Sequence, residues 1–503
     1  MASSQVSGIE VREGNPPTPL GPMNRLPPEI LSHTFEILQG PVPVEQPWPV
    51  FTQVCRWWRS VALAHRPLWS RIDMTKPKLT RISLRRSKCA PLQLHCDDIE
   101  GSGNFHLPVW KNIVQRLARV NELHLHLQSE TQMLYIFNIL IEDSKIPAPH
   151  LDILEIELQR LMDLQEPIFL FMDRAVPCVR HLRLKNFDTF PWRTTSPFSR
   201  LLALDLELES LWADSDSLDI SALLSMLEMA PSLESLRIES HFVPLLGDPG
   251  DKIVDLPNLH HVDLSWSSAN IVVLLEHLRY PLAATVILAG EDSFAHGAWS
   301  IVEILFQQLT EDTMDPPYKL SIKIDSESSL YMQAWGQAGV PLWDLTLENL
   351  PPRQETLISS QILPFFSTAS VLFLSISNGD VDDYLRLLRP LPELEELHVT
   401  TLMRRPTFCD PTIMPFLPQL KMLELQCDVP ESYDTRTLRY IRCVVAAYIE
   451  HKRLHGSLGS LVIAPSENYR FSRAVFRELL EHTDLSWTLK TGKLIGTRAR
   501  ASS

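Results

Sequence analysis

The sequence lacks the marks of a secreted or membrane-spanning protein. Its 503 residues contain no apolar run near the ~18 residues that cross a bilayer, and the opening MASSQVSGIEVREG has no apolar signal-peptide core. There is no Asn-x-Ser/Thr glycosylation site, and the seven cysteines form neither a Cys-x-x-Cys pair nor a regular framework. We therefore expect reduced thiols, no membrane partner, and a protein of the cytoplasm, the nucleus or both.

Familiar catalytic motifs are missing as well. There is no Gly-x-Ser-x-Gly and no Gly-x-Gly-x-x-Gly, and TGKLIGT at 491–497 departs from a phosphate loop at Trp487 and Leu494, where Gly and Ser or Thr are needed. His95 and Cys96 are adjacent, but neighbours in a strand point to opposite faces, which favours a packed cysteine over a metal ligand or nucleophile. We expect no catalytic residue, no metal site and no cofactor.

Charge is distributed unevenly along the chain. The stretch from Cys55 to Lys88 contains ten Lys or Arg and a single acid, Asp73, whereas residues 91–503 contain 34 basic and 55 acidic side chains, a difference of −21. This acidic body would repel a phosphate backbone, so no nucleic-acid partner is expected. The basic stretch is either a solvated helix face or a contact for an acidic protein.

The N-terminal region contains a predicted leader and two predicted helices. Residues 1–22 are rich in Pro and Gly without periodicity, which is typical of a flexible segment. A first helix follows the Pro pair at 27–28, because Leu31, Phe35 and Leu38 recur at helical steps, and the Pro-rich QGPVPVEQPWP ends it. The apolar face of a second helix, near Val50, contains Val54, Trp57, Trp58 and Val61. LWSRIDM is then expected to be extended.

The segment 23–74 contains an ordered set of short motifs: Leu26-Pro27, Glu29-Ile30-Leu31, Phe35, Val54-Cys55-Arg56-Trp57-Trp58 and Leu68-Trp69. This set resembles an F-box, a family with Leu-Pro, Glu with two aliphatic residues, a Phe one turn later, a loop, Val-Cys-x-x-Trp and a closing Leu-Trp. The match covers about 50 residues, and the Pro-rich loop is its one departure from the family pattern.

The resemblance implies that this segment docks on a Skp-type adaptor and, through the adaptor, on a cullin. The implied adaptor-binding residues are Leu26, Pro27, Ile30, Leu31, Phe35, Val54, Cys55, Trp58, Leu68 and Trp69. The alternative is a helical cap on the rest of the chain, with these side chains as its core. The two interpretations overlap, because Trp69 above all would serve the fold.

Residues 75–485 repeat a Leu-x-x-Leu-x-Leu type of core, mostly at intervals of 22 to 34 residues, which resembles the period of leucine-rich repeats. The copies lie at 90–96, 120–127, 151–158, 179–186, 201–208, 233–240, 259–266, 342–349, 394–401, 420–427 and 458–465, with weaker ones at 283–290, 318–325 and 369–376. Helical patterns at 220–230, 270–280, 299–309 and 381–391 lie between them. In leucine-rich repeats two residues and then an Asn usually follow the Leu-x-Leu. Here Asn186 and Asn349 come one position earlier than that, and most of the repeats lack an Asn.

The predicted fold class is α/β: a short all-helical F-box, then an irregular leucine-rich-repeat solenoid with a curved parallel sheet and return helices, then a polar tail at 486–503. The residue between the two Leu of Leu-x-Leu points to the concave face, because strand side chains alternate. Such residues are predicted to bind a target or to be a solvated sheet face: Glu155, Arg183, Asp205, Arg237, Asp263, Thr346, His398 and Glu424.

Together, the two resemblances imply that the chain is the substrate-recognition subunit of an SCF (Skp, cullin, F-box) ubiquitin ligase. The F-box would dock on the adaptor, the solenoid would bind an unidentified target protein, and the transfer chemistry would belong to other subunits. The alternative is a non-catalytic leucine-rich-repeat scaffold that binds proteins independently of a ligase.

Overall fold

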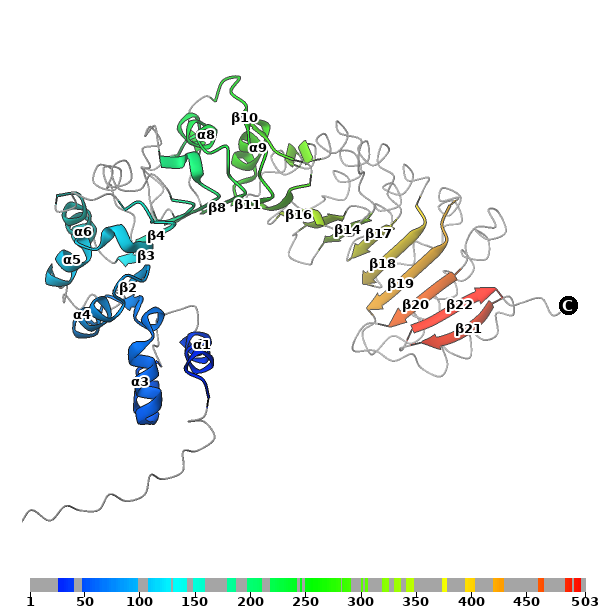
Figure 1. The fold of residues 1–503 in the computed structure, drawn as a ribbon. Coiled ribbons are helices and arrows are strands. Elements are labelled where there is room, and N and C mark those ends of the chain that lie inside the picture. The colour runs from blue at the N-terminus through cyan, green and yellow to red at the C-terminus, as the bar shows by residue number, and fades with distance from the viewer. Residues whose placement is uncertain are drawn as a thin grey trace, which may run out of the picture.

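The computed structural model describes a mixed α/β protein with one long, mostly parallel sheet (Figure 1). The described residues are 26–39, 48–97, 107–127, 130–142, 148–158, 179–186, 197–209, 218–241, 245–246, 249–281, 283–290, 300–301, 304–305, 319–324, 330–335, 341–347, 373–377, 394–402, 419–428, 460–465, 485–490 and 493–498. The predicted leader, Asn349, the helix predicted at 381–391 and most of that predicted at 299–309 lie outside them. Within these ranges no helix is long and apolar enough to span a membrane.

Three helices form a cluster at the N-terminal end. They are α1 (Pro28–Gln39), α2 (Trp48–Val54) and α3 (Arg56–Ala64), followed by the 3-10 turn η2 (Arg66–Trp69). α1 begins at Pro28, where a missing N–H removes no helical hydrogen bond. Cys55 caps α3, because its Sγ accepts a hydrogen bond from the Trp58 backbone N–H at 3.4 Å.

A small apolar core holds this N-terminal cluster together. Its buried members are Leu31, Phe35, Phe51, Val61, Ala62, Leu68 and Trp69. The Phe35 ring stacks on Phe51 with 4.9 Å between centroids and meets the edge of Trp58 at 5.3 Å. The buried indole of Trp69 donates to the carbonyl of Ala62 at 2.9 Å, so its polar atom is satisfied inside the core.

The cluster is continuous with the sheet. The predicted extended piece contains β1 (Arg71–Asp73), which pairs in parallel with β2 (Leu92–Asp97) as the first strand of the long sheet. The helix α4 (Pro77–Arg86) connects the two strands, and its Arg86 guanidinium lies 4.7 Å over the Trp69 ring. The boundary predicted at residue 74, between the F-box-like segment and the repeats, therefore does not mark the start of the sheet, because β1 lies before it.

Every predicted repeat core contains a strand. Besides β2 these strands are β3 (Val120–Leu127), β4 (Ile153–Leu158), β5 (His181–Lys185), β6 (Ala203–Glu209), β8 (Ser235–His241), β11 (His261–Trp266), β13 (Thr285–Gly290), β14 (Lys319–Ile324), β16 (Pro341–Leu347), β17 (Phe373–Ser377), β18 (Glu396–Leu402), β19 (Met422–Asp428) and β20 (Ser460–Pro465). Their register aligns a ladder of side chains that are at most 4% exposed: Leu94, Leu123, Leu154, Leu182, Leu204, Leu236, Val262 and Val286.

Along β2 to β13, helices cover the outer side of the arc that the strands form, and the strands line its inner side (Figure 1). The outer elements are α5 (Leu107–Val114), η3 (Leu117–Arg119), α6 (Glu130–Glu142), η4 (Pro197–Arg200), α8 (Ile220–Glu228) and α9 (Ser268–Glu276), with the short strands β7 (Leu218–Asp219), β9 (Leu245–Leu246), β10 (Val254–Asp255) and β12 (Leu278–Arg279). α8 and α9 match two predicted helices, and Asp219 and Ser267 cap them.

The order of the strands departs from a uniform solenoid in the middle of the sheet. From β1 to β13 the long strands pair in parallel in chain order, but β13 then pairs with β16, and β15 (Leu330–Trp335) lies antiparallel between β16 and β14. β14 resumes the parallel run with β17. Sequence patterns missed β15 because it has no Leu-x-Leu, although its buried Met332 and Ala334 have the strand period of two.

The predicted polar tail at 486–503 is wrong in the part that the structure describes. There β21 (Leu485–Lys490) and β22 (Lys493–Arg498) form an antiparallel pair, and β22 also pairs antiparallel with β20. Leu485, Trp487 and Leu489 alternate with polar residues, which is the strand period. This alternation outweighs the basic composition that suggested a tail.

Asn186 joins three successive repeats. Its backbone has a φ of +62°, a left-handed conformation that Asn tolerates better than most residues. Its buried side chain donates from Nδ2 to the carbonyl of Leu158 at 2.6 Å, and its backbone N–H donates to the carbonyl of Glu207 at 2.7 Å. The end of β5 is thereby tied to the strands on both sides.

Replacing Asn186 with Ala should lower the free energy of unfolding by about 1 to 3 kcal/mol, because a buried hydrogen bond is lost and Ala is strained at this φ. Asn186→Gly should cost less, since Gly adopts the left-handed conformation freely. The matched control is Asn258→Ala, an exposed Asn whose Nδ2 donates to the carbonyl of Pro231 at 3.1 Å. Urea denaturation of the full chain measures all three, and equal effects of Asn186→Ala and Asn258→Ala would contradict the prediction.

Candidate functional site

The register of the parallel strands aligns the residues between the buried leucines into rows on the inner face. In the central row Glu155 lies opposite Arg183, Arg183 opposite Asp205, Asp205 opposite Arg237, and Arg237 opposite Asp263. These five predicted target-binding residues therefore stand side by side on five consecutive repeat strands. All are partly solvent-exposed, as the alternation of each strand requires.

The other three predicted residues lie farther along the sheet. His398 and Glu424 are neighbours in the central row, with 3.0 Å between Nδ1 and Oε2. Thr346 belongs to the adjacent row, opposite Ala289, and the central row on β16 passes through Asp344 instead. The sequence pattern misplaced this position because Thr346 is the residue that lies between the two leucines of a Leu-x-Leu in LWDLTL, whereas the strand register puts Asp344 in the central row.

A second row of charged side chains lies two residues farther along each strand and was not predicted. It contains Asp97, His126, Glu157, Lys185, Glu207 and Glu239. The signal that could have found it is the same alternation extended by one step, because the strand continues past the Leu-x-Leu core. We call the two rows on β2 to β11, together with Glu122, the charged strip. Its members are His95, Asp97, Glu122, His124, His126, Glu155, Glu157, Arg183, Lys185, Asp205, Glu207, Arg237, Glu239 and Asp263.

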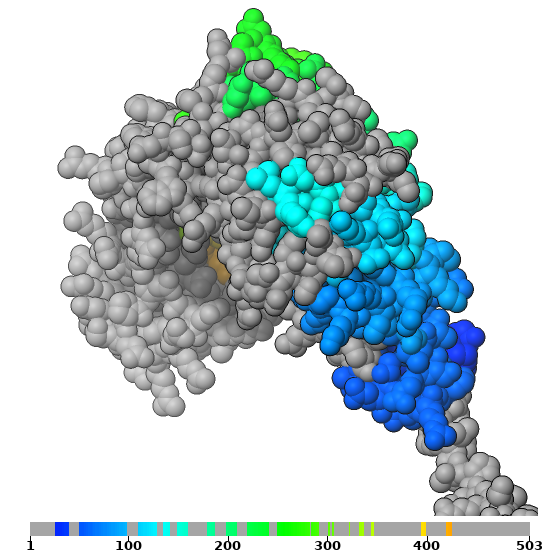
Figure 2. Space-filling view, turned by 90° about the vertical axis from the view of Figure 1, so that its left-hand side faces the viewer, coloured from blue at the N-terminus to red at the C-terminus, as the bar shows by residue number. Residues whose placement is uncertain are grey.

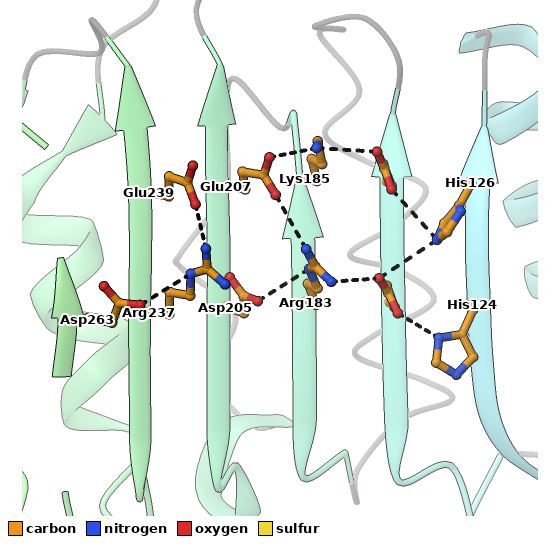
Figure 3. A network of polar contacts seen from close by, with 11 residues as sticks. His124, His126, Arg183, Lys185, Asp205, Glu207, Arg237, Glu239 and Asp263 are labelled. Carbon is orange, nitrogen blue, oxygen red and sulfur yellow. Dashed lines mark hydrogen bonds and ion pairs between the residues drawn. The ribbon is translucent and has the colours of Figure 1, made fainter. Parts of the chain in front are cut away.

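Each cation of the charged strip lies among carboxylates on neighbouring strands (Figure 3). Arg183 reaches three of them: Nη1 is 3.2 Å from Glu155 Oε1, Nε is 3.3 Å from Asp205 Oδ2, and Nη2 is 3.5 Å from Glu207 Oε2. Lys185 bridges the same region, with Nζ at 2.6 Å from Glu207 Oε1. Opposite charges in facing positions on paired strands help to hold the strands in register.

Arg237 continues this arrangement on β8. Its Nη2 lies 2.7 Å from Glu239 Oε2, and its Nε lies 3.5 Å from Asp263 Oδ2. Burial lowers the pKa of the Arg237 guanidinium, but the carboxylates of Asp205, Glu239 and Asp263 together outweigh burial and raise this pKa. Burial raises the pKa of Asp205, against the opposing effect of the charges on Arg183 and Arg237.

A group of histidines forms one end of the charged strip. His124 Nδ1 lies 2.7 Å from Glu155 Oε2, and His126 Nε2 lies 3.8 Å from Glu155 Oε1 (Figure 3). The His95 ring stacks on His124 with 4.3 Å between centroids and 6° between planes. The hydrogen bond with His124, together with the nearby His126, holds the pKa of Glu155 well below its usual range, so this carboxylate stays ionised.

The stacked histidines have opposite protonation preferences. Burial and the neighbouring charge of His124 lower the pKa of His95 to about 4. Burial disfavours the charged form of His124 too, but the carboxylates of Glu122 and Glu155 outweigh it and raise the pKa of His124 to about 9. The contact with Glu155 also raises the pKa of His126, against burial. At neutral pH a neutral His95 therefore lies against a protonated His124.

The charged strip has a surplus of carboxylates. It contains eight Asp or Glu side chains against three Lys or Arg, and His124 adds one more positive charge at neutral pH. Among the residues that the structure describes, no group of three His, Cys, Asp or Glu side chains is placed to hold a metal ion. The arrangement can attract Lys and Arg side chains of a binding partner, which would compete for carboxylates already shared between strands.

The ten predicted adaptor-binding residues differ in how much of their surface is exposed to solvent. Ile30 and Val54 have more than half of their surface exposed, Pro27 is exposed, and Leu26, Cys55 and Trp58 are half-buried. The other four are instead buried in the core of the N-terminal cluster and offer no surface in this conformation: Leu31, Phe35, Leu68 and Trp69. They are apolar at helical spacing, so the sequence alone could not separate core from surface.

Further exposed apolar side chains accompany Ile30 and Val54. Ile37 and Leu38 on α1 and Val50 on α2 are each at least 50% exposed. Leu38 was expected on the buried face of the first helix, but it lies near the C-terminal end of α1 and faces solvent. We call Ile30, Ile37, Leu38, Val50 and Val54 the exposed apolar set.

His124 should make the stability of the chain depend on pH. Because its pKa is about 9 in the folded chain and 6.5 ordinarily, its stabilising contribution is complete below pH 6.5 and is lost as pH rises through 9. The free energy of unfolding should fall by about 1 to 3 kcal/mol across this interval.

Urea denaturation at several pH values tests this expectation. The fall should shrink in His124→Gln and persist in His181→Gln, an exposed histidine on the neighbouring part of the sheet. An unchanged pH dependence in His124→Gln would show that the contacts with Glu122 and Glu155 do not favour protonation.

Comparison with known proteins assigns no family. The chain matches no protein-family model and no curated protein sequence. The resemblances to an F-box and to leucine-rich repeats therefore rest on the residues of this chain, and its function is inferred from the surfaces that the structure displays.

Proposed function

We propose that this chain is the substrate-recognition subunit of an SCF ubiquitin ligase, built from an F-box and leucine-rich repeats. The N-terminal cluster would dock on a Skp-type adaptor, which joins it to a cullin, and the inner face of the sheet would bind a target protein. The chain would supply no catalytic residue. It would accelerate transfer in the ubiquitin conjugation pathway by holding a target lysine near the charged ubiquitin carrier.

The observation that carries this proposal is the exposed apolar set. Eight large hydrophobic side chains among the described residues are exposed, and five of them lie on α1 and α2. The remaining three, Ile82, Tyr135 and Ile253, are spread over the rest of the described chain. Apolar side chains concentrated on one small unit are typical of a protein-binding surface.

The position of the cluster also suits an adaptor-binding unit. Its helices project from one end of the molecule, as the blue segment in the space-filling view shows (Figure 2). The charged strip lies on strands β2 to β11, away from α1 and α2 in the chain. Binding at one surface would therefore leave the other available for a second protein.

A second candidate is a protein-binding scaffold that uses the N-terminal cluster as a cap. The continuity of the cluster with the sheet favours it: β1 is the first strand, Trp69 packs in the cluster core, and Arg86 of α4 lies over the Trp69 ring. Terminal repeats of solenoids need such covers. A cap requires the buried core, but it does not require exposed Ile and Val side chains on α1 and α2.

Co-purification with a Skp-type adaptor separates the two candidates. The double variant Ile30→Ser, Val54→Ser alters exposed side chains only, so its melting temperature should match that of the unaltered chain while adaptor affinity falls by about tenfold or more. The matched control is Ile82→Ser, Ile253→Ser, whose side chains are 37% and 46% exposed outside the cluster.

Retention of the adaptor by the control and its loss by the first variant would support the receptor. If the unaltered chain does not bind the adaptor, or if both variants lose it equally, the scaffold becomes the better explanation.

A further inference from the structure

A groove with a volume of about 610 Å³ lies along the edge where β3 to β6 begin. Its lining comes from the turns that precede these strands and includes Arg119, Asp152, Arg180 and Arg200. None of the lining residues belongs to the charged strip or to the exposed apolar set. The volume is in the range of sites that hold small ligands or short peptide segments.

The groove is basic, although the chain as a whole is acidic. Three arginines and His150 line it, against a single acid, Asp152. The chain as a whole has a formal net charge of −15 at pH 7. A concentration of guanidinium groups in such a chain points to a ligand with negatively charged oxygens, because Arg pairs with carboxylates and phosphates through two parallel hydrogen bonds.

Arg119 is held rigidly in the lining. Its Nη2 donates to Ser87 Oγ at 3.1 Å and to the carbonyl of Ala90 at 2.8 Å. Its Nε is buried and has no hydrogen-bond partner among the described residues. Burial, and after it the like charge of Arg116, lower the pKa of Arg119, so an anion in the groove would relieve an unfavourable environment.

Arg180 enters the groove from the next part of the sheet. Its Nε lies 3.6 Å from Asp152 Oδ1, and its side chain is 57% exposed. Its backbone is locked in place, because its N–H donates to the carbonyl of Asp152 at 2.9 Å and its carbonyl accepts from the Leu202 N–H at 2.7 Å. Arg119 precedes β3, Arg180 precedes β5 and Arg200 precedes β6, so the pairing of these strands fixes the positions of the three backbones relative to one another.

We propose that this groove binds an acidic segment of a partner protein, with carboxylate or phosphate groups of its side chains placed against Arg119, Arg180 and Arg200. Asp152 in the lining and the acidic body of the chain oppose a continuous polyanion such as nucleic acid. They tolerate a peptide whose negative charges are spaced apart. The site does not depend on adaptor docking, so it goes beyond the proposed function and can fail or hold independently of it.

The test measures fluorescence anisotropy of short labelled peptides added to the full chain. One peptide alternates Glu with Ser, a second has phosphoserine in place of Glu, and a third has Gln in place of Glu. We expect saturable binding of one or both acidic peptides, weakened by added salt, and none of the Gln peptide. The relative affinity of the first two identifies carboxylate or phosphate as the preferred group.

Variants locate the binding site. Arg180→Gln, Arg200→Gln should weaken binding about tenfold or more. The matched control Arg56→Gln, Arg81→Gln makes the same change in net charge at exposed residues outside the groove and should weaken binding less than about threefold. Equal loss in both double variants would mean diffuse electrostatic attraction and would overturn the proposal.

Cys89 gives a second readout that does not depend on mutating an arginine. This exposed thiol lines the groove, so a bound acidic peptide should slow its alkylation, followed by mass spectrometry of the Cys89 peptide. The rate at Cys55, outside the groove, should stay the same. No saturable peptide binding, unprotected Cys89, or tighter binding of a single-stranded oligonucleotide with the same arginine dependence would each reject an acidic protein segment as the ligand.

Discussion

Parallel pairing in one continuous register is the constraint on which the rest of this structure depends. Each repeat strand lines up its buried leucines with those of the strands beside it, as Leu123 does between Leu94 and Leu154. A slip of one residue would turn every strand over and place residues such as Glu155 in the core. The hydrogen bonds of Asn186 and the ion pairs of the charged strip reinforce the same register from the two sides of the sheet.

The described residues form three chemically different surfaces. The inner face carries the charged strip, in which carboxylates outnumber cations. The edge where the strands begin carries a basic groove lined by Arg119, and the N-terminal cluster exposes apolar side chains such as Ile30. Adaptor binding, target binding and recognition of an acidic segment would use separate surfaces. A receptor that brings proteins together needs such surfaces and no chemistry of its own.

Local pattern predicted much of the architecture. The Leu-x-x-Leu-x-Leu cores predicted a strand in every repeat. The register brought seven of the eight expected inner-face residues into the central row, and five of them stand side by side. The sequence pattern did not predict strands that lack the Leu-x-Leu core. β15 lies antiparallel between β14 and β16, and β21 and β22 form an antiparallel pair where a tail was expected. The pattern also failed to separate Leu31 from Ile30, because both are apolar neighbours in the same helix.

The sequence by itself determined the repeating strands, the inward leucines and the identity of the residues between them, because side-chain alternation is a local property of a strand. It also determined that the N-terminal segment resembles an F-box. Only the tertiary structure decided which charges meet, such as Arg183 with Glu155 and Glu207, and which arginines line one groove. These juxtapositions join residues on different repeats, so they depend on register and stacking, which no single repeat encodes.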